Sequence, residues 1–128
     1  MVNFPSQLQQ ERGASNRLSL WISHGGQSRD MGILKTGSYY INGHVHVTEA
    51  FNSDGSDTLI VGYSGDTDAF IESIDTSSTG IKSVTVGAAK GYNSTARTIT
   101  ATYTAGGSAP TAGKALVILE IWPVPIQP

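Results

Sequence analysis

Two adjacent strand patterns near the end of the chain constrain its fold more than any other feature. From Ala96 to Ala105 the sequence ARTITATYTA alternates in polarity, with Ile99, Ala101 and Tyr103 on one parity and Thr98, Thr100 and Thr102 on the other. A period of two is typical of a β-strand with one buried face, here with threonines lining the opposite face. The segment ALVILEIW that follows is apolar on both parities except at Glu120, so we expect both of its faces to be covered.

Similar patterns recur along the chain and predict an all-β fold. We expect strands at residues 17–23, 39–51, 58–63, 81–86, 96–105 and 115–122, with a short edge pairing at Ile33 and Leu34. Roughly seven or eight short strands separated by turn residues favour a β-sandwich, jelly-roll-like, over a parallel-sheet fold.

Two segments depart from simple alternation. Residues 69–74 place their apolar side chains on one side of two helical turns, which Asp66 or Thr67 could cap and Gly80 could end, so we predict one short helix there. Asn42–Gly43 is the preferred dipeptide of a type I′ turn and predicts a hairpin within 39–51. A single strand kinked at that glycine is the alternative.

The 128 residues suffice for one domain with an ordinary core. We assign residues 17–122 to the β-sandwich domain, residues 1–16 to an extended N-terminal arm and residues 123–128 to an extended, proline-rich C-terminal tail. The arm shows no sustained hydrophobic period. The tail cannot join a sheet centrally, because proline has no N–H to donate.

The composition argues against several classes of partner. Charged residues make up 14% of the chain, the formal net charge is -2 and the basic residues are scattered, so we expect no nucleic acid and no membrane as partner. The absence of cysteine excludes disulfides and thiolate metal sites. Residues 1–10 lack the basic start and apolar run of a signal peptide, and no apolar stretch approaches transmembrane length.

Candidate metal and catalytic groups are sparse. His44 and His46 share one strand face and could supply two metal ligands. Their parity, however, places them among polar surface residues. A third ligand would have to come from another part of the chain or from another copy of the protein. The aspartates in SDGSD and GDTD could serve calcium, yet they also suit turns. No G-x-S-x-G elbow and no phosphate-binding loop is present. We therefore expect no cofactor, no metal and no enzymatic activity.

Two long segments resemble small structural proteins of tailed bacteriophages, namely capsid cement or decoration (head-stabilising) proteins. The segments are DTLIVGYSGDTDAFIESIDTSSTG and ARTITATYTAGGSAPTAGKALVILEIW, and the matching turns and strands are Leu59–Gly62, Gly65–Phe70 and Tyr103–Gly113. The resemblance covers about residues 45–121 and leaves out both ends of the chain. It implies a β-rich protein, commonly a homotrimer, on the outer capsid surface of the virion, made in the cytoplasm of a bacterial host. It implies the major capsid protein as partner and no catalytic residues.

The residues expected to make these contacts fall into two groups. The arm would contact the shell through Phe4, Leu8, Arg12 and Arg17. The trimer interface would use Trp21, Tyr40, Trp122, Val124 and Ile126. Strand parity places Trp21 and Tyr40 opposite the Leu/Ile faces, so we expect them to be exposed, in a second layer or against a partner.

Two rival functions remain open at this stage. One rival is the carbohydrate-binding or receptor-binding head of a phage fibre or tail component, since aromatic rings suit sugar contacts. Seven aromatic residues could build such a platform, although most of them also suit a core or a sheet edge: Trp21, Tyr39, Tyr40, Tyr63, Tyr92, Tyr103 and Trp122. A small hydrolase would require His44 or His46 to converge with a carboxylate and a serine.

Overall fold

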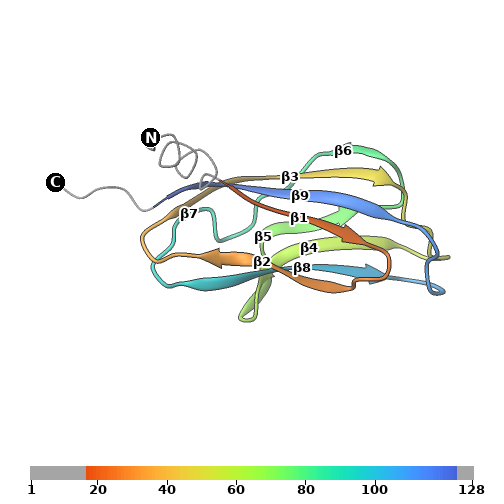
Figure 1. Ribbon diagram of the computed structural model, residues 1–128, viewed down its shortest axis with the longest axis horizontal. Helices are drawn as coiled ribbons and strands as arrows, with labels where there is room; N and C mark the ends of the chain where they lie inside the picture. The colour runs from red at the N-terminus through yellow and green to blue at the C-terminus, as the bar shows by residue number, and fades with distance from the viewer. Residues whose placement is uncertain (1–16, 124–128) are drawn as a thin grey trace, which may run out of the picture.

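The computed structural model describes residues 17–123, which form a sandwich of two antiparallel sheets (Figure 1). The strands are β1 (Arg17–Ser23), β2 (Ser28–Leu34), β3 (Tyr39–Glu49), β4 (Asp57–Tyr63), β5 (Asp66–Asp75), β6 (Gly80–Lys82), β7 (Gly91–Tyr92), β8 (Arg97–Ala105) and β9 (Lys114–Trp122). Within this part of the chain there is no helix, and so none that could cross a membrane.

The strand order is that of a jelly roll. One sheet runs β1-β9-β3-β6, with the short β7 also pairing with β3, and the other runs β2-β8-β4-β5. The chain changes sheet at most connections, and β4 and β5 form the hairpin that stays within one sheet. Two sheets with the strand orders β1-β9-β3-β6 and β2-β8-β4-β5 are the jelly-roll architecture, and β7 adds a short fifth strand to the first sheet. The β-sandwich fold expected from the sequence is therefore confirmed.

The core lies between the two sheets and follows the predicted strand phases. Its buried members include Ile22, Ile99, Tyr103, Val117, Leu119 and Ile121, which share the inward parity of their strands, while Leu18 and Leu20 are partly buried against it. On the opposite parity of β9, Leu116 and Ile118 are only half-buried. The expectation that both faces of this strand are covered therefore holds for the inner face, and the outer face keeps partly exposed aliphatic side chains.

Residues 39–49 form one continuous strand, so the hairpin predicted at Asn42–Gly43 is wrong. β3 pairs with β9 along its length, but the register shifts between Tyr40 and Asn42, which leaves Ile41 as the extra residue of a β-bulge. A bulge reverses the side-chain alternation beyond it. Tyr40 therefore faces the core, fully buried, and its predicted exposure is wrong.

The predicted short helix is also wrong, because residues 66–75 form the edge strand β5. Two register irregularities with β4, between Leu59 and Val61 and between Val61 and Tyr63, place extra residues in β5. These irregularities bury Phe70 and Ile71 in succession and make the apolar spacing resemble that of a helix. The strand predicted at 81–86 is shorter in the structure, where β6 ends at Lys82. Further along this range, Val86 forms an isolated bridge with Ile71.

Candidate docking face

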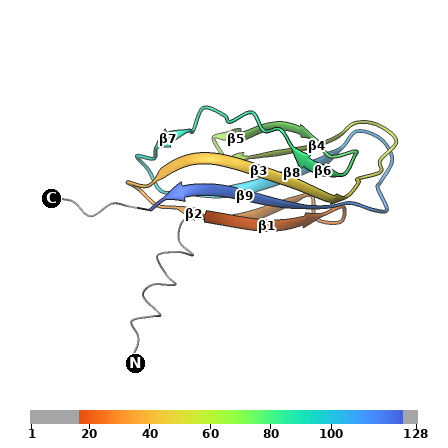
Figure 2. The same ribbon diagram turned by 90° about the horizontal axis from the view of Figure 1, so that it is seen from above.

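The outer face of the sheet β1-β9-β3-β6 collects most of the large exposed apolar side chains of the described chain. Figure 2 shows β1, β9 and β3 side by side in this sheet. The pairing registers arrange the outward residues in four cross-strand rows. These rows are Trp21–Leu116–His46–Ile81, Ser19–Ile118–His44, Arg17–Glu120–Asn42 and Trp122–Tyr39–Tyr92. We call these residues the docking face.

Three aromatic rings form one end of the docking face. Tyr39 lies between the other two, with its ring centroid 5.4 Å from that of Tyr92 and 5.9 Å from that of Trp122. The outer members remain open to solvent, since Tyr92 is 59% exposed and Trp122 is 61% exposed. Offset and edge-on aromatic contacts of this kind hold the rings in place, so the cluster presents a firm apolar surface.

The row at the other end is apolar at both of its edges. Trp21 on β1 is 49% exposed and Ile81 on β6 is 80% exposed, with the half-buried Leu116 between them. Together with the aromatic cluster, this row places apolar side chains at both ends of one sheet face. Large exposed apolar side chains gathered on one face of a domain mark it as a candidate interaction surface.

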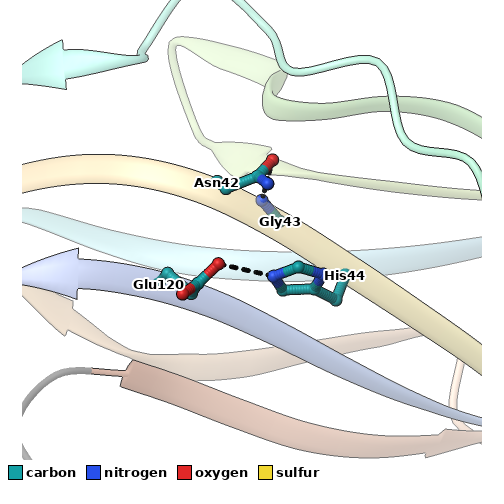
Figure 3. Close-up of polar contacts among 4 residues, drawn as sticks. All are labelled: Asn42, Gly43, His44 and Glu120. Carbon is teal, nitrogen blue, oxygen red and sulfur yellow. Dashed lines mark hydrogen bonds and ion pairs between the residues drawn. The ribbon is translucent and has the colours of Figure 1, made fainter.

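The middle rows carry the polar groups of the docking face. His44 Nε2 lies 2.6 Å from Glu120 Oε1, across from β3 to β9 (Figure 3). Asn42 is not part of this pair, because its side-chain oxygen accepts a hydrogen bond of 2.9 Å from the N–H of Gly43. The pair is about half exposed, and an ion pair in that setting adds at most about 1 kcal/mol to stability.

Among the described residues these groups do not assemble a metal site. Among residues 17–123, no three His, Cys, Asp or Glu side chains lie close enough together to hold a metal ion. His44 and His46 point away from the core, as their parity predicted. Of the aspartates considered for calcium, Asp57 is buried and bonded to Tyr103, and Asp54 accepts a hydrogen bond from Ser108 at 2.8 Å.

The structure brings some of the predicted contact residues together and separates others. Arg17, Trp21 and Trp122 all lie on the docking face. Tyr40 does not, because it is enclosed by the core of its own domain. The remaining predicted contacts, Phe4, Leu8, Arg12, Val124 and Ile126, lie outside the described residues.

Three members of the docking face were not among the residues predicted for the trimer interface. Tyr39 shares the sequence parity of the buried Val45 and Val47, and the bulge at Ile41 turns it outward. Tyr92 lies outside every strand expected from the sequence, and the two-residue strand β7 sets it beside Tyr39. Ile81 was treated as an ordinary strand residue. A pairing register for β6 and β7 would have been needed to find the last two.

Comparison with known proteins identifies similar folds. No family model matches the sequence, and no curated protein matches it significantly. A chain from the "Cyanophage Pam1 capsid asymmetric unit" superimposes with a TM-score of 0.61 at 12% identity, over 84% of this chain and 83% of that chain. A chain from the "Acidic stable capsid structure of Helicobacter pylori bacteriophage KHP30" gives a TM-score of 0.62 at 10% identity, over 87% and 89%. At these identities the likeness establishes a shared fold. Because the paired coverages are nearly equal, both matched chains are about as long as this one.

Proposed function

We propose that this chain is a structural virion protein that binds the outer surface of a phage capsid and stabilises the shell as a cement or decoration protein. The observation that carries the proposal is the docking face, an exposed aromatic and aliphatic surface on a complete sandwich. Trp and Tyr are the residues that most often dominate the energy of protein interfaces. A sheet face of this kind gains stability when another protein surface covers it.

The shared fold and the chain length support a place in a virion. Both similar structures are described as capsids, and the chains matched in them are about as short as this one. The sequence resemblance to phage cement proteins, which rests on different observations, points the same way. In this proposal the protein is made in the bacterial cytoplasm and performs no catalysis.

The proposed assembly is a homotrimer that attaches to the major capsid protein. Trp21 and Trp122 on the docking face would contact neighbouring copies, together with Val124 and Ile126 of the tail. Arg17, at the start of β1, pairs with Glu120 near the end of β9, so the arm and the tail both join the domain at one end of this face. Phe4, Leu8 and Arg12 of the arm would then reach the shell beside the trimer contact.

The proposed mechanism is stabilisation by mass action. A protein that binds the assembled shell but not its dissociated subunits shifts the equilibrium toward the shell by RT ln(1 + [L]/Kd) for each site. Three linked attachment points multiply weak individual contacts, because the second and third bind at high effective concentration. This mechanism requires a stiff domain and a well-packed interface, and it requires no reactive group.

A sedimentation experiment tests the proposal. The molar mass of the full chain in solution is first measured by analytical ultracentrifugation, and we expect that of a trimer. It is then mixed with empty shells of the virus whose genome encodes it, and we expect saturable co-sedimentation and shells that dissociate at higher urea concentration. A monomer that neither co-sediments with shells nor protects them would contradict the proposal.

A further inference from the structure

A groove whose chemistry differs from that of the docking face lies at one end of the opposite sheet, where β4 turns into β5 and β8 begins. Its wall combines Thr98 and Thr100, on the outward parity of β8, with Arg97, which has the parity of the buried Ile99. The turn between β4 and β5 projects beyond the sandwich, below β8 in Figure 1. Beside it lie two adjoining depressions of about 620 Å³ and 240 Å³, which share Tyr63, Ser64 and Thr100. Their other lining residues are Thr95, Ala96, Arg97 and Thr98 in the larger, and Ser28, Gly62, Thr67 and Thr102 in the smaller.

Arg97 is the one charged side chain in this lining. Its guanidinium carbon lies 4.0 Å above the centre of the Tyr63 ring, and that ring in turn contacts Phe70 edge-on. Within residues 17–123 the Arg97 side chain forms no ion pair, and its Nε is buried without a hydrogen-bond partner. Stacking fixes the plane of the guanidinium and leaves the N–H groups of its two Nη atoms without a partner among the described residues. Two parallel N–H donors match the two oxygens of a carboxylate.

Serine and threonine side chains make up most of the remaining lining, beside the Tyr63 ring, Ala96 and Gly62. Thr100 donates to Asp30 at 3.0 Å, and the hydroxyls of Ser28 and Thr102 lie 3.4 Å apart. The threonines of β8 stand on one face because β8 alternates strictly, so they line the groove as a row. A hydroxyl both donates and accepts hydrogen bonds, and so it can pair with another hydroxyl in either direction.

We propose that this groove binds an acidic saccharide, with Arg97 holding its carboxylate and the hydroxyls of Ser64, Thr95 and Thr98 bonding to the hydroxyls of the sugar. The volume of the groove falls within the range of small-molecule sites, about 300–1,000 Å³. An acidic peptide would also satisfy Arg97, but its backbone and carboxylates offer no row of hydroxyls to pair with those of the serines and threonines. The groove lines one end of the sheet β2-β8-β4-β5 and the docking face belongs to the other sheet, so a protein on the docking face would leave the groove open. The inference does not depend on the capsid proposal.

Calorimetric titration of the full chain with three probes tests the inference. Trigalacturonate is the acidic saccharide, galactotriose its neutral counterpart, and triglutamate the acidic peptide. We expect saturable binding of trigalacturonate at least about tenfold tighter than of the other two, because only it offers both the carboxylate and the sugar hydroxyls. In ¹⁵N–¹H spectra the amide signals of Ser64, Arg97 and Thr98 should shift on binding.

Variants locate the site and control for folding. Arg97→Gln should weaken trigalacturonate binding at least about tenfold, and Arg97→Lys should weaken it too, since lysine keeps the charge but loses the planar fork. Arg29→Gln makes the same charge change on β2, outside the groove lining, and should leave binding unchanged. Thr98→Val removes one hydroxyl at nearly constant side-chain volume and should also weaken trigalacturonate binding. It tests the same site if an Arg97 variant fails to fold.

Four results would overturn the inference. They are no binding of trigalacturonate, equal binding of galactotriose, equal or tighter binding of triglutamate, and binding that survives both Arg97→Gln and Thr98→Val. The third result would assign Arg97 to an acidic segment of a partner protein instead.

Discussion

The phenol of Tyr40 donates a hydrogen bond of 2.6 Å to the main-chain carbonyl of Phe70, from a strand of one sheet to a strand of the other. The two rings also meet edge-on, with centroids 4.8 Å apart. Gly43 makes room for this contact, because a Cβ there would lie 2.7 Å from the Ile71 side chain and 2.8 Å from the Tyr40 hydroxyl. One polar bond thus joins the two sheets inside an apolar core.

Tyr40→Phe should lower the free energy of unfolding by about 0.5–1.5 kcal/mol, because the Phe70 carbonyl loses its phenol donor and keeps only the N–H of Gly87, at 3.2 Å. Urea denaturation of the isolated protein measures the change. Tyr39→Phe is the matched control, since Tyr39 belongs to the partly exposed docking face and should change stability by less than about 0.5 kcal/mol. If the two substitutions lower the free energy of unfolding equally, the buried hydrogen bond of Tyr40 stabilises the domain no more than the partly exposed hydroxyl of Tyr39 does.

A second substitution tests the packing at Gly43. Gly43→Ala should destabilise the domain by about 1–3 kcal/mol, because the added methyl group would overlap atoms of two buried side chains. Gly25→Ala is the control, since no atom lies within 4 Å of a Cβ at Gly25. If both substitutions leave the urea midpoint unchanged, the close approach at Gly43 does not exist.

The sequence predicted the elements that alternate strictly and failed where a bulge interrupts them. The strands β1, β8 and β9 alternate without interruption, and their buried residues were identified from parity alone. In β3 and β5 the inserted residues shift the alternation. A bulge depends on pairing with another strand, and the local sequence does not contain that partner. The outward position of Tyr39 and the inward position of Tyr40 could not be predicted for this reason.

The docking face was predictable only in part, for a related reason. Trp21 and Trp122 lie on strands whose parity is regular, so their outward direction could be inferred. Tyr92 and Ile81 belong to strands of two and three residues, which are too short to show a period. Their place beside β3 follows from tertiary pairing alone. The groove at Arg97 combines residues from β4, β8 and the segments beside them, and no local motif marks it.

A buried carboxylate and a tyrosine predict a pH dependence at the alkaline end. Tyr103 donates a hydrogen bond to Asp57, and both side chains are almost fully buried. Burial, with the hydrogen bond to Asp57 as the second cause, raises the pKa of Tyr103 from 10.0 to about 12. The stabilisation linked to this shift is fully present below pH 10 and is lost as the pH rises from 10 through about 12, because the unfolded chain releases the proton first.

Tyr103→Phe separates this effect from that of the other tyrosines. The substitution should cost about 1–3 kcal/mol near neutral pH, since Asp57 then keeps the main-chain N–H of Ser53, at 3.3 Å, but loses its phenol donor. Between pH 10 and 12 the difference in stability between the two proteins should shrink. A difference that stays constant over this interval would mean that Tyr103 titrates normally.

The core is expected to respond strongly to truncation. Leu119→Ala should destabilise the domain by about 2–5 kcal/mol, because Leu119 is fully buried between the sheets. Ile81→Ala removes methyl groups from a side chain that is 80% exposed and should cost less than about 0.5 kcal/mol in the isolated chain. The denaturant midpoints of the two variants compare their stabilities directly. A loss below about 1 kcal/mol for Leu119→Ala would mean that Leu119 does not face the core.

The last prediction concerns the docking face as an interface between copies. Replacing Trp21 and Trp122 together with serine should convert the proposed trimer to a monomer and abolish shell binding, because it removes the two largest exposed aromatic side chains of the face. The stability of the domain itself should change by no more than about 1 kcal/mol, since both side chains are about half exposed or more. Ile33→Ser is the control, because Ile33 is 62% exposed but lies on the opposite sheet. Ultracentrifugation measures the oligomeric mass of the unchanged protein, the double tryptophan variant and the Ile33→Ser control. If the control is a monomer and the double variant is still a trimer, the interface lies on the β2 side of the sandwich.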